Sequence, residues 1–209
     1  MRLILLLWLA TSLSATLTAQ RFGAAVVAGM NASQIDGDQL AGYDKIGLTA
    51  GFKTMIQFES AIKLNVEFLY AERGSRPSIW NDSYDPDVNI TLQYMEIPFY
   101  VSVGDWWQEE GGYHKVTAHG GFSYGRLFQA KTVDYYNSSE DSYDLLVPYF
   151  NDNDFSWMLG ATYRFSPRFG IMGRYTRGIT PLLDAEKHNL NRQRLLTYFL
   201  TLRLEYYFK

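Results

Sequence analysis

The chain has 209 residues, no cysteine and a formal net charge of −3, and 47% of its residues are hydrophobic. The lack of cysteine excludes a disulfide framework, and a slightly acidic balance without a Lys/Arg cluster argues against a nucleic-acid-binding protein. Aromatic residues are abundant, with 16 Tyr, 13 Phe and 5 Trp. This content is typical of the interfacial girdles of membrane barrels, and also of secreted β-rich binding domains.

The first 19 residues have the parts of a secretory signal peptide. A short basic start is followed by the apolar run LILLLWLA at residues 3–10 and then by small residues up to Ala19. Cleavage after Ala19 leaves Gln20 as the mature N-terminus, and Ala15 is the alternative position. The Thr- and Ser-rich second half disfavours an uncleaved membrane anchor, which needs about 20 apolar residues. Residues 20–209 are then expected to form a single domain.

Apolar residues alternate with other residues at a period of two in eight segments, which predicts β-strands because successive strand side chains point to opposite faces. In chain order these segments are Phe22–Met30, Gly47–Phe58, Ala61–Arg73, Tyr94–Val103, His114–Phe128, Phe155–Phe165, Phe169–Thr180 and Leu196–Phe208. Each covers the roughly 9–11 residues that a tilted strand needs to cross the hydrocarbon layer. No later run is long and apolar enough for a membrane helix, so strands must do any crossing.

The last predicted strand has the most continuous alternation. Its even-numbered positions, from Leu196 to Phe208, are all apolar or aromatic. A long final strand that ends in an aromatic residue is typical of outer-membrane barrels, and the aromatic end resembles the signal that barrel-insertion machinery recognises. Its edge must pair with Phe22–Met30, since an open ladder is not tolerated in lipid. Pro98, inside the fourth strand, has no N–H to donate, so a bulge or a local break in pairing is expected there.

The connections between the strands alternate between short and long. Two are short, Glu59-Ser60 and Ser166–Arg168, and Gly104–Tyr113 is intermediate in length. The others are long and polar: residues 31–45, 74–89, 129–154 and 178–194. Outer-membrane barrels combine short periplasmic turns with longer outer loops in this way. The sequence therefore predicts an all-β protein, an eight-stranded antiparallel up-and-down transmembrane β-barrel with both termini in the periplasm.

The polar faces of the predicted strands carry eight charged side chains, which are Lys53, Lys63, Glu67, Glu96, Arg164, Arg174, Arg203 and Glu205. An eight-stranded barrel is just wide enough for its own side chains to fill the interior. An unpaired buried charge costs several kcal/mol, so these residues are expected to pair with one another. We interpret them as a structural network that fills the lumen, with a transport or catalytic site as the alternative. The apolar faces are expected to contact outer-membrane lipid.

No motif for catalysis, for a metal ion or for a cofactor is apparent. His114, His119 and His188 lie in different elements and match no metal-ligand spacing. The Gly120–Gly125 run lacks the Lys-Ser/Thr of a phosphate loop, and neither a Gly-x-Ser-x-Gly elbow nor a cysteine nucleophile is present. We expect no enzyme, no cofactor and no metal. The loop Gln129–Asp154 places six acidic residues among Tyr and Phe, a composition that suits either a binding surface or a solvated loop.

Several motifs follow one another along the mature chain: Gly29-Met-Asn31, Gly47-Leu-Thr-Ala-Gly51, Leu64-Asn-Val-Glu-Phe-Leu-Tyr70, Leu92-Gln-Tyr-Met-Glu-Ile-Pro98, Gly120-Gly-Phe-Ser-Tyr-Gly125, Gly170-Ile-Met-Gly-Arg-Tyr175 with Gly178-Ile-Thr180, and Leu204-Glu-Tyr-Tyr-Phe208. In this order they resemble the PorT-type outer-membrane β-barrel family of Gram-negative bacteria, and Tyr94-Met-Glu-Ile-Pro98 is the most distinctive piece. The chain departs from the family in its longer Trp106-Trp107 turn and in Lys209 after the final aromatic. The resemblance implies an eight-stranded barrel, and the family's namesake takes part in protein secretion across the outer membrane.

The sequence therefore predicts a small integral outer-membrane barrel with a structural or binding role through its long outer loops. The expected partners are outer-membrane lipid, the barrel-insertion machinery during biogenesis, and an envelope or secretion protein. Three alternatives stay open. They are an accessory component of a secretion or motility machine, a soluble lipocalin-like binder with an apolar lumen, and a membrane-embedded hydrolase with a Ser/His pair.

Overall fold

The computed structural model of the chain describes residues 21–38, 40, 42–59, 61–77, 88–134, 143–185, 187 and 194–208. Its strands are β1 (Arg21–Asp36), β2 (Lys45–Gln57), β3 (Ile62–Ser75), β4 (Val88–Gln108), β5 (Tyr113–Asp134), β6 (Asn153–Arg164), β7 (Phe169–Gly178) and β8 (Leu196–Tyr207). A short 3-10 helix, η1 (Tyr143–Tyr149), lies between β5 and β6. Over these same residues, no helix is long and apolar enough to span a membrane. The predicted signal peptide lies outside the described residues.

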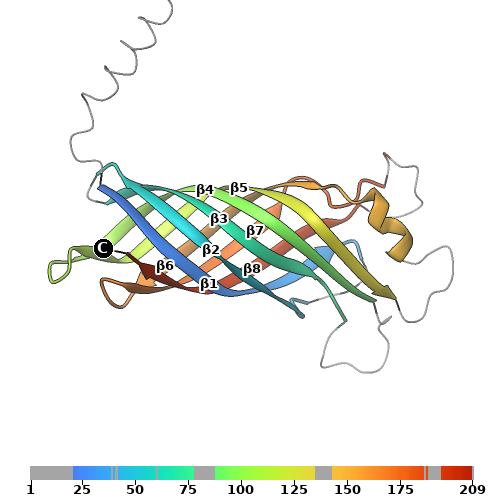
Figure 1. Cartoon of the computed structure of the whole chain (residues 1–209), viewed down its shortest axis with the longest axis horizontal. Helices are drawn as coiled ribbons and strands as arrows, with labels where there is room; N and C mark the ends of the chain where they lie inside the picture. The colour runs from blue at the N-terminus through green and yellow to red at the C-terminus, as the bar shows by residue number, and fades with distance from the viewer. Residues whose placement is uncertain are drawn as a thin grey trace, which may run out of the picture.

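The eight strands form a closed barrel in sequence order, each antiparallel to its two neighbours (Figure 1). The last strand returns to the first, with Met30 opposite Leu202 and Asp36 opposite Leu196. Closure leaves no strand edge without a partner, which is the condition for a sheet to cross lipid. The predicted eight-stranded antiparallel barrel and the pairing of its terminal strands are therefore confirmed.

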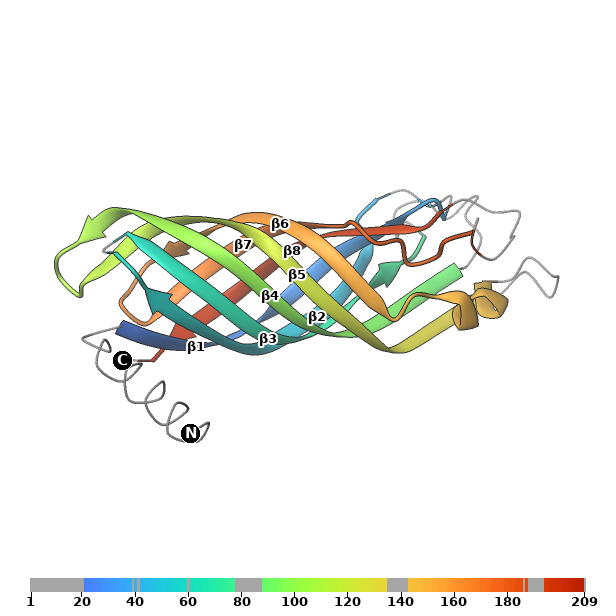
Figure 2. The ribbon, with the colours of Figure 1, turned by 90° about the horizontal axis from the view of Figure 1, so that it is seen from above.

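Several strands are longer than the sequence predicted, because segments assigned to connections continue the ladder. β4 has 21 residues and β5 has 22, and their hairpin projects beyond the other strands at one end of the barrel (Figure 2). The predicted connection Gly104–Tyr113 was wrong, since Gly104 pairs with Thr117 and Gln108 pairs with Tyr113. The turn itself comprises residues 109–112. Gly111 in this turn has a φ of 122°, a backbone conformation that favours glycine.

The two ends of the barrel differ in their connections. Short turns at residues 58–61, 109–112 and 165–168 join strands at the end where the C-terminus lies. The long connections join strands at the opposite end, where η1 lies (Figure 1), and span residues 37–44, 76–87, 135–152 and 179–195. Since short turns face the periplasm in outer-membrane barrels, we call the η1 end the outer end and the opposite end the periplasmic end.

Side-chain exposure follows the predicted alternation. Many outward-facing apolar side chains are exposed, as are Phe52 (64%), Phe122 (64%) and Leu204 (58%). The inward-facing neighbours are buried, as in Lys53 and Arg203. A continuous apolar outer face around a polar interior is the arrangement that suits a barrel surrounded by lipid.

The pairing of β4 with β3 is interrupted at Pro98, as the sequence predicted. The ladder between β3 and β4 runs through Val66–Phe99 and resumes at Leu69–Glu96, so Pro98 and Ile97 have no partner on β3. This is the expected local break at a residue without an N–H. The register shift between β4 and β5 lies elsewhere, at Gln93/Tyr94.

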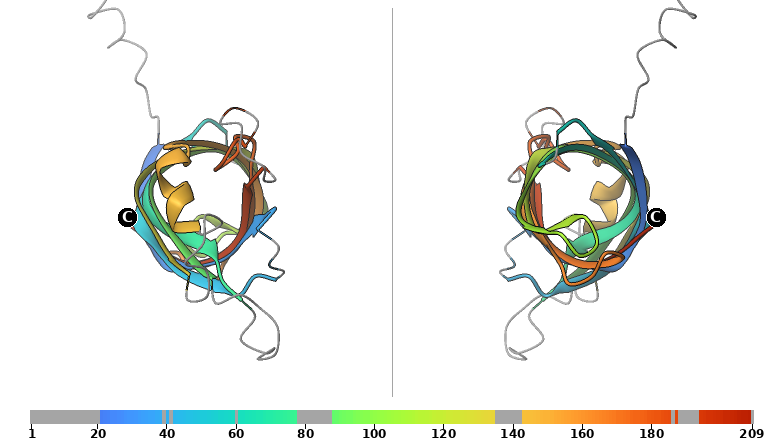
Figure 3. Two further views of the ribbon diagram at one scale, coloured as in Figure 1. Left: turned by 90° about the vertical axis from the view of Figure 1, so that its right-hand side faces the viewer. Right: turned by 90° about the vertical axis from the view of Figure 1, so that its left-hand side faces the viewer.

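An apolar cluster that was not predicted from the sequence lies toward the outer end of the barrel. In the left view of Figure 3, which faces this end, η1 lies within the outline of the barrel. Leu146 of η1 and the following Phe150 are buried against inward-facing residues of β1, β4 and β5 and against the segment before β8. The cluster comprises Ile35, Ile90, Leu92, Tyr94, Leu127, Leu146, Phe150, Leu182, Leu183 and Leu195. We call this cluster the outer apolar cap.

Candidate functional site

Five of the eight charged residues singled out from the sequence meet inside the barrel as one ion-pair network. Lys53 Nζ lies 3.0 Å from Glu205 Oε2, and Arg174 Nη1 lies 3.1 Å from Glu67 Oε2. Arg203 joins the two pairs, because it donates to both Glu67 and Glu205. The side chains of Glu67, Arg203 and Glu205 are fully buried. Each buried charge therefore has a partner of opposite sign, as burial requires.

Two tyrosines complete the hydrogen bonding of the two carboxylates. The Tyr100 hydroxyl donates to Glu67, and the Tyr207 hydroxyl donates to Glu205. The Arg174 guanidinium also lies 4.8 Å from the centre of the Tyr100 ring, within the range of a cation–π contact. The sequence placed both tyrosines on inward faces but did not include them in the network.

Glu96 belongs to a second, separate ion-pair group. Arg73 Nη2 lies 2.7 Å from Glu96 Oε1, and Arg73 Nη1 lies 2.9 Å from Asp154 Oδ2. The guanidinium is held between the rings of Tyr94 and Phe199, at 4.0 and 4.7 Å from their centres. This group lies next to the outer apolar cap, which includes Tyr94.

Arg73 and Asp154 were not predicted to belong to the interior network, although the same two-residue period places both inward. Arg73 shares the parity of Lys63 and Glu67, but the apolar Leu69 and Ala71 interrupt the polar face between them. Asp154 precedes the start predicted for its strand, whereas β6 already begins at Asn153. Both residues would have been found by following the inward-facing positions of the two-residue period to the end of one predicted strand and just before the start of the other.

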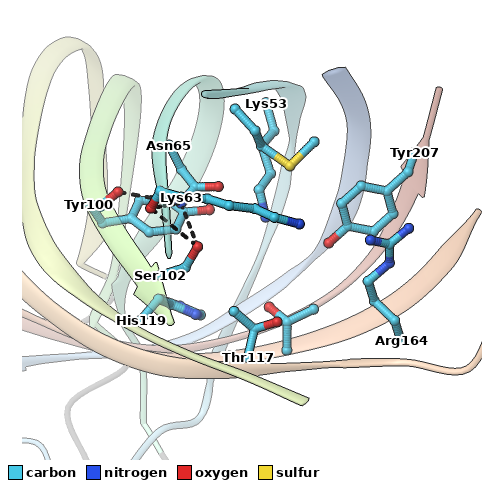
Figure 4. Close-up of a pocket in the computed structure, with 11 residues that line it drawn as sticks. Lys53, Lys63, Asn65, Tyr100, Ser102, Thr117, His119, Arg164 and Tyr207 are labelled. Atoms are coloured by element: carbon cyan, nitrogen blue, oxygen red, sulfur yellow. Dashed lines mark hydrogen bonds between the residues drawn. The ribbon is translucent and has the colours of Figure 1, made fainter. Parts of the chain in front are cut away.

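Lys63 and Arg164 join neither group. They line two adjoining cavities at the periplasmic end, of about 140 Å³ and about 20 Å³, and Figure 4 shows the inner one. The Arg164 guanidinium lies 4.0 Å from the centre of the Tyr207 ring and donates to the carbonyl of Pro167. No Asp or Glu of the described chain lies within ion-pair distance of Lys63 or Arg164.

Two of the three histidines can be placed. His119 is buried beside Tyr100, with 5.0 Å between ring centres, and His114 packs against Trp107 at 4.8 Å. His188 lies outside the described residues. Within the described ranges, no three His, Cys, Asp or Glu side chains are grouped so that they could hold a metal ion.

The family of the chain follows from a comparison with models of known families. The model described as "Outer membrane protein beta-barrel domain" matches residues 15–184, which is most of the chain. The chain belongs to this family. An apolar outer face is the surface that barrels of this kind present to lipid. A search of curated protein sequences gave no match.

Several solved structures resemble this outer-membrane β-barrel. Ail, the attachment invasion locus protein of Yersinia pestis, solved with the heparin analogue sucrose octasulfate, is 13% identical, with 90% of this chain and 99% of that chain covered and a TM-score of 0.47. Neisserial surface protein A is 10% identical over 88% and 96% of the two chains, with a TM-score of 0.47. The outer membrane protein OprG from Pseudomonas aeruginosa is 10% identical over 90% and 93%, with a TM-score of 0.38. Nothing about the role of this chain follows from likenesses of this size.

Proposed function

We propose that this outer-membrane β-barrel has a structural or binding role, in which its outer loops make the contacts and its charged interior keeps the barrel filled. The observation that carries the proposal is the buried ionic interior. The Glu67 and Arg203 side chains of the network are fully buried, and the residues of the outer apolar cap are buried as well. Buried side chains of this kind support a role other than passive conduction, since small barrels are filled by their own side chains.

Within this proposal, all eight charged residues of the sequence analysis serve the interior. Lys53, Glu67, Arg174, Arg203 and Glu205 form the central network, while Glu96 acts together with Arg73 and Asp154. Lys63 and Arg164 lie at the periplasmic mouth. A polar and ionic lumen argues against the lipocalin-like alternative, which needs an apolar ligand cavity.

The outer end offers an anchored surface for binding. Leu146 and Phe150 fix η1 to the barrel through the outer apolar cap. On the same short helix, Leu145 is 56% exposed and Tyr149 is 42% exposed. Apolar and aromatic side chains on a segment that is already fixed lose little conformational entropy when a partner binds, which favours a binding surface.

Conductance in planar bilayers tests the role of the buried ionic interior. Purified barrel, first shown to be folded by heat-dependent gel mobility, is expected to give no steady conductance. A steady channel in the folded protein would contradict the proposal, because water and ions would then pass both the central network and the outer apolar cap.

Site-directed photo-crosslinking tests the outer surface. A crosslinker at Leu145 on intact cells is expected to capture an envelope protein or an external ligand, whereas the matched position Glu109 in a periplasmic turn is not expected to capture the same species. If neither position yields an adduct, the binding part of the proposal fails and a structural role remains.

The PorT-type resemblance supports one alternative, an accessory role in a secretion or motility machine. Co-purification of the barrel with secretion components would favour this alternative, and a barrel that purifies alone would count against it. Export through a cleaved signal peptide at residues 1–19 is part of either proposal. N-terminal sequencing of protein extracted from membranes is expected to begin at Gln20.

A further inference from the structure

At the periplasmic end of the interior, Lys63 and Arg164 have no carboxylate within ion-pair distance among the described residues. Lys63 of β3 and Arg164 of β6 line both the outer cavity of about 140 Å³ and the smaller inner one. Met55 and Tyr207 line both cavities as well. None of the described residues that line either cavity is Asp or Glu. We call the two cavities together the periplasmic vestibule.

The carboxylates closest to the periplasmic vestibule are already occupied. In Glu205, Oε1 accepts hydrogen bonds from Arg203 and Oε2 accepts them from Lys53 and Tyr207. The described charged groups in this half of the lumen are five cations and two carboxylates, a net charge of +3: Lys53, Lys63, Arg164, Arg174, Arg203, Glu67 and Glu205. Like charges in a partly desolvated cavity repel one another, and a bound anion would remove that cost.

The residues of the periplasmic vestibule also include polar atoms without partners. The His119 side chain lines the inner cavity and is 6% exposed, and its Nε2 has no hydrogen-bond partner. Arg164 Nε likewise has none. Thr117 and Thr162 also line this cavity, and Figure 4 shows Thr117 across the cavity from Lys63. Buried polar atoms without partners are rare in proteins and suggest a missing ligand or ordered water.

We propose that the periplasmic vestibule binds a phosphate group that enters from the periplasm, with Lys63 and Arg164 as its charged partners. Phosphate suits this site better than a carboxylate, because it has more acceptor oxygens for the several donors and because the guanidinium fork matches it. The site lies at the opposite end from the outer loops, so the inference is independent of the proposed binding role.

Two sources could supply the phosphate group. One is a soluble phosphate compound of the periplasm. The other is the headgroup of a phospholipid in the inner leaflet of the outer membrane, because Phe22 and Phe208 line the mouth of the cavity and are 67% and 51% exposed. An apolar rim beside a cationic cavity would accept an acyl chain and a headgroup together.

Isothermal titration calorimetry on the folded protein in an uncharged detergent tests the proposal. The probes are inorganic phosphate, glycerol phosphate and short-chain phosphatidylglycerol, with acetate for comparison. Saturable binding with one site per barrel is expected. Lys63→Gln is expected to weaken it about tenfold to a hundredfold, the range for loss of one charged hydrogen bond.

Two further variants sharpen the test. Lys115→Gln is the matched control, because Lys115 lies on β5 at the same end, packs over the Trp106 ring at 4.8 Å, and lines neither cavity. Its affinity for phosphate should equal that of the wild type. Thr117→Val removes one neutral donor and should weaken binding about threefold to tenfold. If Lys63→Gln does not show the heat-dependent gel shift of a folded barrel, the affinity of Thr117→Val for phosphate tests the proposal instead.

The results distinguish the two sources of the phosphate group from each other and from the absence of a phosphate site. Binding of inorganic phosphate and glycerol phosphate supports a soluble ligand, and binding of phosphatidylglycerol alone supports a lipid headgroup. The proposal is overturned if no phosphate probe binds saturably, if the vestibule variants bind as well as Lys115→Gln, or if acetate binds as tightly as phosphate.

Discussion

The fully buried carboxylate of Glu67 gives the sharpest test of how the interior supports the barrel. It accepts five hydrogen bonds, from Arg174 (3.1 and 3.2 Å), from Arg203 and from the Tyr100 hydroxyl. Glu67→Gln keeps the shape of the side chain but removes its charge and turns an amide N–H₂ toward two guanidinium groups. Loss of one partner from a buried ion pair costs about 3–5 kcal/mol, because the other charge stays buried without compensation.

Equilibrium unfolding in urea, followed by tryptophan fluorescence of the barrel in lipid or detergent, measures this effect. With a denaturant slope of about 2 kcal/mol/M, a loss of about 4 kcal/mol moves the midpoint down by about 2 M. The matched control is Asp152→Asn, which breaks the Arg126–Asp152 pair at 2.8 Å, where both side chains are about half exposed. That change should cost less than about 1 kcal/mol. If Glu67→Gln costs no more than the control, the interior network does not stabilise the barrel.

Three further predictions concern the sheet, an outer loop and the outer apolar cap. Gly121→Val should prevent the folded, heat-shifted band on gels, because a Cβ there would clash with the Phe99 carbonyl oxygen, whereas Gly173→Ala, with nothing within 4 Å, should fold normally. Burial raises the pKa of Asp38 above its ordinary 3.8, so its ionisation costs stability as the pH rises through the folded-state pKa. Asp38→Asn, which can still accept from the Leu40 N–H, should therefore raise the urea midpoint at pH 7 and leave it unchanged below pH 3.8; no pH dependence would contradict this. Leu146→Ser should release η1 and speed its cleavage by protease added to intact cells, while Leu145→Ser, at an exposed position, should not; equal cleavage of the two variants would refute the anchoring role.

The predicted strands were confirmed because alternation is a local property. Along each strand, alternate residues in the sequence face opposite sides of the sheet. When the sheet closes into a barrel, the polar face becomes buried and the apolar face becomes exposed. The limits of the strands were less accurate. The hairpin of β4 and β5 extends past the apolar alternation through Trp106 to Gln108, in a region that contacts no apolar core and so carries no clear periodic signal.

The outer apolar cap shows a second limit of the sequence. Ile90 and Leu92 lie at the start of β4, before the strand that the alternation predicted, and Leu146 lies in a predicted loop. A single apolar residue at such a position does not indicate in the sequence that it belongs to a cluster. Only the folding of η1 back over the barrel mouth brings them together.

The sequence by itself determined that this protein is an eight-stranded outer-membrane barrel with an apolar outer face and inward-facing charges. Only the tertiary structure decided which charges meet. Arg174 and Arg203 reach Glu67 across 107 and 136 residues of chain, while Lys63 and Arg164 form no ion pair with any described carboxylate. The reason is geometric: alternation fixes the face of each residue, but its height and its neighbours inside the lumen depend on the stagger of all eight strands at closure.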